Sequence, residues 1–215
     1  MALSIGFNKI KTAVFISGKG SNLNSLIKFS KLKNSPIIIS MIVSNNTKSK
    51  GLEYGKIHKI KKKIFDFKNT LSEKKIINEL EKNQINLICL AGFMKILSKN
   101  FIKNFNGKIL NIHPSLLPKY KGLNTHEKAI KNKDKYSGCT VHFVNSKLDS
   151  GKIINQKKVR INKLDTAKTL AKKILIQEHK LYPEAITKIL SLWKRNLFQF
   201  LRFRHYQIHV QNFYQ

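Results

Sequence analysis

Residues 12–29, TAVFISGKGSNLNSLIKF, decide the fold. The stretch begins with a short apolar run rich in β-formers. Gly18 and Gly20 follow at once, where glycine lets the backbone turn tightly and approach a ligand. Ser21 or Asn22 can then cap a helix whose apolar residues keep helical spacing. The stretch therefore predicts a strand, a glycine turn and a helix, which together open an α/β sheet.

The glycine turn is also a candidate anion site, because free N–H groups at the start of a helix favour a phosphate. It is not a Walker motif, since no Lys-Ser/Thr pair closes it. It is not the dinucleotide fingerprint either, since the third glycine is missing. On this local evidence a plain strand-to-helix turn remains the alternative.

Apolar runs and helix-like segments alternate along the rest of the chain. The predicted strands are 12–16, 36–43, 64–67, 86–91, 108–110, 137–145 and 152–161. The predicted helices are 21–29, 51–60, 70–80, 98–105, 125–132 and a long helix that Asp165 caps and that runs through Ile189. This order predicts an α/β, Rossmann-like fold, with a mostly parallel twisted sheet, helices on both faces and a late antiparallel hairpin.

The composition indicates one domain with a strongly positive surface. The chain has 215 residues and a formal net charge of +31, and a domain of this size buries roughly 70% of its unfolded surface. Its lysines are scattered, whereas readers of nucleic acid favour clustered arginine, so we expect no specific nucleic-acid partner. Cys89 and Cys139 lie in apolar runs and read as buried thiols. No run reaches the roughly 20 apolar residues of a membrane span, and no signal segment is evident, so we expect a cytoplasmic protein.

The second informative stretch is 107–122, GKILNIHPSLLPKYKG. Asn111 and His113 are two residues apart, so both side chains leave the same face of an extended backbone. An amide and an imidazole there can polarise a carbonyl and handle a proton. Asp149, predicted at the hairpin tip, can orient and charge the imidazole, although an Asx-turn residue before glycine is the alternative. Ligands of parallel sheets bind beyond the carboxyl ends of the strands, which places 18–22, 92–97 and 111–113 on one rim.

Six motifs in this order and spacing closely resemble the phosphoribosylglycinamide formyltransferases. They are SGKGSNL (17–23), AGFMKIL (91–97), ILNIHPSLLPKYKGLNTH (109–126), GCTVHFV (138–144), LDSG (148–151) and QEHKLYP (177–183). The resemblance covers about residues 12–190 and is most specific around 111–126. It implies transfer of a formyl group from 10-formyltetrahydrofolate, as co-substrate, to the amine of glycinamide ribonucleotide.

The resemblance also implies roles for individual residues. It implies that the catalytic residues are Asn111, His113 and Asp149. It implies that the ribonucleotide phosphate binds Gly20, Ser21 and Asn22, and that the glycinamide part contacts Glu178. It implies that the folate pocket is lined by Met94, Lys95, Ile96, Leu97 and Asn111. We expect the Asn111 amide and a protonated His113 to stabilise an oxyanion, with Asp149 raising the pKa of His113. We expect no metal, small-molecule substrates only, and a monomer or homodimer. The basic folate contact usual near Asn69 is not evident.

The chain departs from the family in its last part. We therefore predict a single formyltransferase domain over 1–190 and a basic, aromatic extension over 191–215, which we expect to pack on the domain. Stacking on nucleic acid or lying on a membrane surface are the alternatives. We interpret His126 and His142 as loop and strand residues that could border the folate site.

Three other functions compete with the main reading. A methionyl-tRNA formyltransferase shares the chemistry but carries a second nucleic-acid-binding domain, and a formyltetrahydrofolate deformylase usually carries an N-terminal regulatory domain. We expect neither domain here. A basic nucleic-acid-binding module without catalysis would rest on the charge and the last segment alone.

Overall fold

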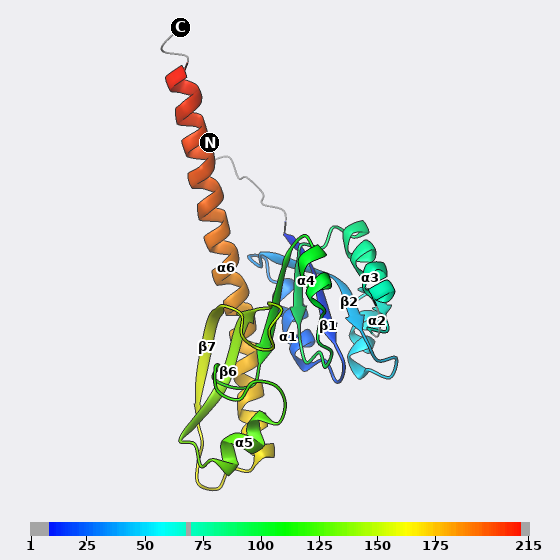
Figure 1. The fold of residues 1–215 in the computed structure, drawn as a ribbon, viewed down its shortest axis with the longest axis vertical. Helices are drawn as coiled ribbons and strands as arrows, with labels where there is room; N and C mark the ends of the chain where they lie inside the picture. The colour runs from blue at the N-terminus through cyan, green and yellow to red at the C-terminus, as the bar shows by residue number, and fades with distance from the viewer. Residues whose placement is uncertain (1–8, 68–69, 212–215) are drawn as a thin grey trace.

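A computed structural model of the chain describes residues 9–67 and 70–211, with backbone only for residue 70 and residues 193–211. Within this part, seven strands form one sheet in the order β3-β2-β1-β4-β5-β6-β7 (Figure 1). The first five strands are parallel, and β6 and β7 are antiparallel to their neighbours. The strands are β1 (Ile10–Ile16), β2 (Ile37–Ser44), β3 (Lys61–Ile64), β4 (Leu87–Leu90), β5 (Lys108–His113), β6 (Tyr136–Phe143) and β7 (Ile153–Arg160). The predicted α/β fold with a late antiparallel hairpin is confirmed.

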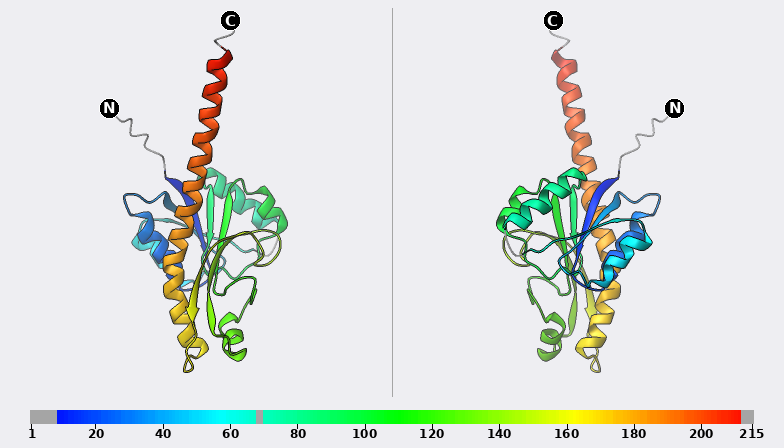
Figure 2. Two further views of the ribbon diagram at one scale, coloured as in Figure 1. Left: turned by 90° about the vertical axis from the view of Figure 1, so that its left-hand side faces the viewer. Right: turned by 90° about the vertical axis from the view of Figure 1, so that its right-hand side faces the viewer.

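Helices cover both faces of the sheet (Figures 1 and 2). They are α1 (Ser21–Ser30), a 3-10 turn η1 (Lys50–Leu52), α2 (Glu53–Ile57), α3 (Thr70–Lys82), α4 (Lys99–Asn104), α5 (Thr125–Lys131) and α6 (Ala167–Gln211). The strand period of two explains the two cores. In β1, Val14 and Ile16 face the cluster beneath α1 and α6, whereas Ala13 and Phe15 face the cluster beneath α3 and α4.

Helix α6 is hydrogen-bonded to two neighbouring strands, β4 and β5, that lead to the rim of the predicted site. Tyr182 of α6 is fully buried, and its hydroxyl lies 3.1 Å from the carbonyl oxygens of both Leu90 and Leu110. Leu90 is the last residue of β4, and Leu110 lies in the middle of β5. Beyond the buried Leu190, the ribbon of α6 continues away from the sheet (Figures 1 and 2). The packing of 191–215 on the domain stays a prediction, because the side chains of 193–215 lie outside the described part of the chain.

Two predicted elements have wrong bounds, and one predicted helix cap is wrong. The third strand is Lys61–Ile64 and not 64–67, because a lysine-rich strand is tolerated at an exposed sheet edge and Lys61 and Lys63 pair with Glu79 at 2.7 and 3.3 Å. The helix predicted over 51–60 ends at Ile57, just before a left-handed residue at position 59. Thr166, and not Asp165, caps α6, since its hydroxyl oxygen accepts the N–H of Thr169 at 3.2 Å.

The two outer strands of the sheet carry many basic side chains. β3 reads KKKI, and β7 reads IINQKKVR. Among the described strands, each of these two has a neighbour on one side only, so one row of its backbone N–H and C=O groups has no strand partner there. Among the described helices, none has the length and apolar composition that a bilayer crossing requires.

Replacing Tyr182 with phenylalanine tests the link between α6 and the strand ends. We expect Tyr182→Phe to lower the free energy of unfolding by about 0.5–1.5 kcal/mol, because one buried hydrogen-bond donor is lost. Urea denaturation measures this change. Leu164→Ala is the control, since the Leu164 side chain is 94% exposed and the change should stay within about 0.5 kcal/mol. An unchanged unfolding midpoint for Tyr182→Phe would contradict the proposed link.

Candidate active site

The three side chains predicted to act together lie together. Asn111 and His113 lie in the carboxyl-terminal half of β5, and Asp149 lies in the loop after β6. The His113 Nδ1 atom is 3.3 Å from Asp149 Oδ2, and the Asn111 Nδ2 atom is 3.4 Å from Asp149 Oδ1. His113 is 5% exposed and Asp149 is 9% exposed. An amide, an imidazole and a carboxylate thus share one largely buried cluster.

Asp149 is held in place by the backbone of the loop after β5. Its Oδ2 atom accepts the N–H of Gly122 at 2.8 Å. Its own φ is 42°, a left-handed value that aspartate tolerates better than most residues. Burial alone raises the pKa of Asp149, but the side chain of His142, the Gly122 N–H and the charge of His113 lower that pKa by more. Asp149 therefore stands ionised beside His113.

The ring of His113 is fixed by a contact that the sequence did not suggest. Its Nε2 atom lies 2.8 Å from the carbonyl oxygen of Tyr120. A carbonyl only accepts, so Nε2 carries a proton and donates it, and Nδ1 is the nitrogen that faces Asp149. Burial lowers the pKa of His113, while the Tyr120 carbonyl and the Asp149 charge oppose this lowering in part. We expected a raised pKa; Asp149 acts in that direction, but desolvation is the stronger effect.

His142 belongs to this cluster, although we interpreted it as a strand residue at the edge of the folate site. It is the cross-strand partner of Asn111. Its Nδ1 atom donates to the carbonyl oxygen of Phe143 at 2.8 Å, and its Nε2 atom lies 3.2 Å from Asn111 Nδ2. The same Nε2 lies 3.6 Å from Asp149 Oδ1. The antiparallel register of β5 and β6 was the signal that would have placed His142 beside Asn111.

The glycine turn is closely packed and leaves the start of α1 open. Gly20 precedes α1 with φ 72°, and a Cβ on Gly20 would lie 2.8 Å from the Cα of Gly51. No side chain in the described part of the protein caps α1, so the expected caps Ser21 and Asn22 do not act as caps. Gly18 is held by Ser49, whose hydroxyl donates to its carbonyl oxygen at 2.7 Å. The result is a helix N-terminus suited to an anion.

Asn22 turns inward to Glu178 instead of capping α1. Its Nδ2 atom donates to Glu178 Oε2 at 2.7 Å, and both residues are 7% exposed. The Asn22 Oδ1 atom is buried and has no hydrogen-bond partner among the described residues. Burial raises the pKa of Glu178, and the hydrogen bond from Asn22 opposes this only in part. Two of the predicted substrate-binding residues, one from α1 and one from α6, are thus joined directly.

The predicted folate-lining segment follows β4. Ser17, at the end of β1, accepts the N–H of Met94 on its hydroxyl oxygen at 2.8 Å. Met94 and Ile96 are 61% and 75% exposed, Lys95 is exposed, and Leu97 is buried. Since β1, β4 and β5 are neighbours in the sheet, the three predicted segments follow the carboxyl ends of adjacent strands, as expected.

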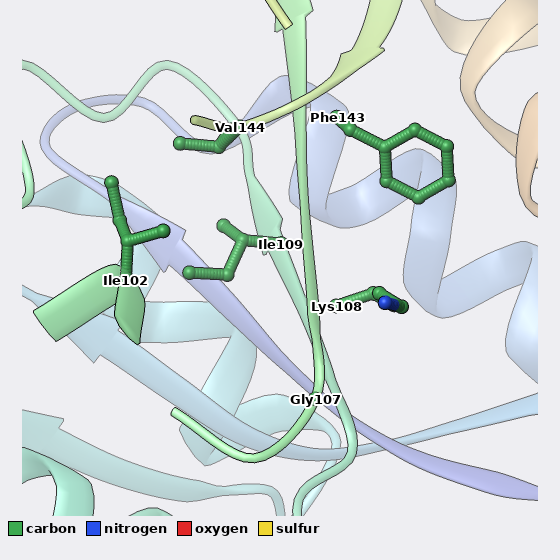
Figure 3. A pocket seen from close by; sticks show the side chains of 6 residues that line it. All are labelled: Ile102, Gly107, Lys108, Ile109, Phe143 and Val144. Carbon is green, nitrogen blue, oxygen red and sulfur yellow. The ribbon is translucent and has the colours of Figure 1, made fainter. Parts of the chain in front are cut away.

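A cavity of about 460 Å³ lies elsewhere. Figure 3 shows its lining side chains, which come from α4, the beginning of β5 and the end of β6: Ile102, Gly107, Lys108, Ile109, Phe143 and Val144. This is the opposite end of β5 from His113. Among the described residues, no group of three or more His, Cys, Asp or Glu side chains has a metal-binding arrangement.

Comparison with known proteins agrees with this geometry. A family model described as formyl transferase matches residues 10–186. Phosphoribosylglycinamide formyltransferase of Haemophilus influenzae is 42% identical over 180 residues, which cover 82% of this chain and 85% of that protein. The human trifunctional purine biosynthetic protein adenosine-3 is 41% identical over 187 residues, and the match spans 85% of this chain but only 18% of the human protein.

A solved structure shows the same fold. The crystal structure of phosphoribosylglycinamide formyltransferase from Brucella melitensis matches with a TM-score of 0.80 at 39% identity, and the match covers 85% of this chain and 96% of that one. The chain therefore belongs to the formyl transferase family, among the phosphoribosylglycinamide formyltransferases.

Proposed function

We propose that this protein transfers a formyl group from 10-formyltetrahydrofolate to the amine of N1-(5-phospho-D-ribosyl)glycinamide, a step of de novo purine (IMP) biosynthesis. The observation that carries the proposal is the buried cluster of Asn111, His113 and Asp149, on the same rim as the uncapped start of α1. The names of the similar proteins support the same reaction. We propose that the protein acts as a monomer or a homodimer.

The ribonucleotide is placed by the turn and by the Asn22–Glu178 pair. In this proposal the phosphate lies on the backbone N–H groups at Gly20, Ser21 and Asn22, because no side chain occupies them as a cap. The Glu178 carboxylate, held by Asn22, meets the glycinamide part. The free acceptor Oδ1 of Asn22 gives a further polar contact for the substrate.

The folate lies against the segment after β4. Met94 and Ile96 offer exposed apolar surface to the pterin ring system, and Leu97 anchors the segment in the core. Lys95 offers a positive charge to the glutamate carboxylates of the folate. Asn111 lies one strand away and faces the formyl group.

The reaction requires that the formyl carbonyl is activated and that one proton moves from the substrate amine to folate N10. The lone pair of the substrate amine attacks the formyl carbon, and the carbonyl electron pair moves to oxygen. The Asn111 amide N–H groups, which face His142 and Asp149 in the free protein, turn to this oxyanion. One such donor is commonly worth about 2.7–4 kcal/mol.

His113 moves the proton between the two nitrogen atoms. Its lowered pKa leaves Nδ1 free at neutral pH to take the proton that the attacking amine loses. The imidazolium formed in this way is stabilised by the ionised Asp149 and can donate to the oxyanion. The oxyanion electron pair then re-forms the carbonyl, the bond between the formyl carbon and folate N10 breaks, and N10 takes the proton from the imidazolium. In this proposal each step is assigned to a side chain, and we propose that no metal takes part.

The first test measures transfer directly and removes the proposed proton carrier. Folate release from 10-formyltetrahydrofolate should require glycinamide ribonucleotide, and His113→Ala should lower kcat by about 10²–10⁴-fold because the proton has no carrier. His58→Ala is the matched control, since His58 contacts Lys31 away from the site. Release without the ribonucleotide would indicate a deformylase, and near-normal kcat in His113→Ala would refute the mechanism.

A second test follows the pKa of His113 by NMR of labelled imidazole. Asp149→Asn removes a negative charge that favours the imidazolium, so we expect the pKa of His113 to fall further below its ordinary value of about 6.5. In the unmodified protein, kcat/KM should decline as the pH falls through this pKa, since Nδ1 becomes protonated. Asp165→Asn should leave the His113 titration unchanged. A rise in the pKa of His113 in Asp149→Asn would contradict the assigned charge.

A third test concerns the extension. We propose that residues 1–190 form the catalytic domain and that 191–215 lies outside it, because the family model ends at residue 186 and the proposed site residues end at Glu178. Deleting 191–215 should leave kcat and both KM values unchanged. Loss of transfer in a deletion variant that circular dichroism and urea unfolding show to be folded would assign the extension to the site.

A further inference from the structure

The loop that binds His113 has an unusual backbone at the contact. Tyr120 has φ 55°, a left-handed conformation that residues with a Cβ rarely adopt. In this conformation its carbonyl oxygen accepts His113 Nε2 at 2.8 Å and the Ser115 hydroxyl at 3.3 Å. The orientation of this one peptide therefore decides which nitrogen of His113 carries the proton and which one faces Asp149.

The side chain of Tyr120 is held by groups outside the catalytic cluster. Its hydroxyl donates to Asp134 Oδ2 at 2.8 Å and accepts from Asn132 Nδ2 at 2.6 Å. The other carboxylate oxygen, Oδ1, accepts from Lys119 Nζ at 2.6 Å. Asp134 thus binds two consecutive residues of the loop, and its side chain is only 13% exposed.

We propose that Asp134 is a positioning residue for His113: by binding the Tyr120 hydroxyl, it holds the Tyr120 carbonyl where His113 Nε2 donates to it, and so keeps Nδ1 turned to Asp149 and the substrate. The inference rests on the proposed role of His113 in formyl transfer. It adds a residue 21 positions along the chain from His113, in the turn between α5 and β6.

Of the two residues that Asp134 binds, Tyr120 is the one through which Asp134 acts on His113. The Lys119 side chain is 57% exposed, and an ion pair with so exposed a lysine contributes little because solvent screens it. The Tyr120 hydroxyl, in contrast, is shared between Asp134 and Asn132 and belongs to the residue whose carbonyl binds the histidine. The charged and titratable groups that act on His113 are Asp149, His142, Lys128 and His126. Changes at Asp134 leave all four in place.

Two variants remove the link from its two ends. Asp134→Ala removes the acceptor, and Tyr120→Phe removes the hydroxyl while keeping the ring. Each should lower kcat about tenfold or more, up to about 10²-fold, because a small displacement of a catalytic group has effects of this size. The KM values for both substrates should change much less. The double variant should be no slower than the slower single variant, since both changes break the same link.

Matched variants separate positioning from general stability. Asp165→Ala removes a carboxylate that accepts a lysine at the same 2.6 Å distance but lies at the start of α6, so kcat should not change. Asp134→Asn keeps an acceptor for the Tyr120 hydroxyl and should restore most of the activity lost in Asp134→Ala. A normal kcat in both Asp134→Ala and Tyr120→Phe, or an equal loss in Asp165→Ala, would overturn the proposal.

NMR of labelled histidine tests the contact between His113 and Tyr120 without an activity assay. The Nε2–H signal of His113 should lose protection from exchange, and the pKa of His113 should fall, in Asp134→Ala and Tyr120→Phe but not in Asp165→Ala. An unchanged His113 signal in both variants would refute the positioning role even if activity fell. If the unmodified protein transferred no formyl group while the His113 signal still responded, the proposed function would fail and the structural link would stand.

Discussion

The buried carboxylate of Asp149 is the constraint around which the site is built. A charge this far from solvent is costly unless charged or polar partners surround it. Two groups donate hydrogen bonds to it, the Gly122 N–H and the Asn111 amide. The imidazoles of His113 and His142 lie 3.3 and 3.6 Å from its oxygen atoms. They come from the loop after β5, from β5 itself and from β6. Satisfying one charge therefore draws the strand end, the following loop and the antiparallel hairpin together.

The arrangement separates the roles of two nitrogen atoms on one ring. The Tyr120 carbonyl accepts a hydrogen bond from the protonated Nε2 of His113, and Asp149 lies beside Nδ1. A neutral imidazole in this setting is a base with a stabilising charge already in place. Burial makes the neutral form the resting state, and the nearby carboxylate reduces the energy needed to charge the ring during the reaction.

Much of this site follows from sequence pattern, since it depends on local geometry. The spacing of Asn111 and His113 puts both on one face of a strand, and the glycines of 18–20 mark the turn before α1. His142 was missed because its contact with Asn111 depends on the register between two strands. The contacts of Tyr120 and Asp134 depend on a left-handed loop residue and a backbone carbonyl, which no residue pattern encodes. The capping residue of α6 differs from the prediction by one position, because the neighbouring Asp165 and Thr166 both have side chains that can cap a helix.

The lysine-rich outer strands have a consequence for the life of the chain in a crowded solution. A sheet with two open edges offers backbone groups that another sheet can join, which is a common route to aggregation. Charged side chains along β3 and β7 repel a second copy of the same edge. The positive charge of these strands thus acts as a barrier to self-association, which replacement of their lysines by apolar residues would weaken.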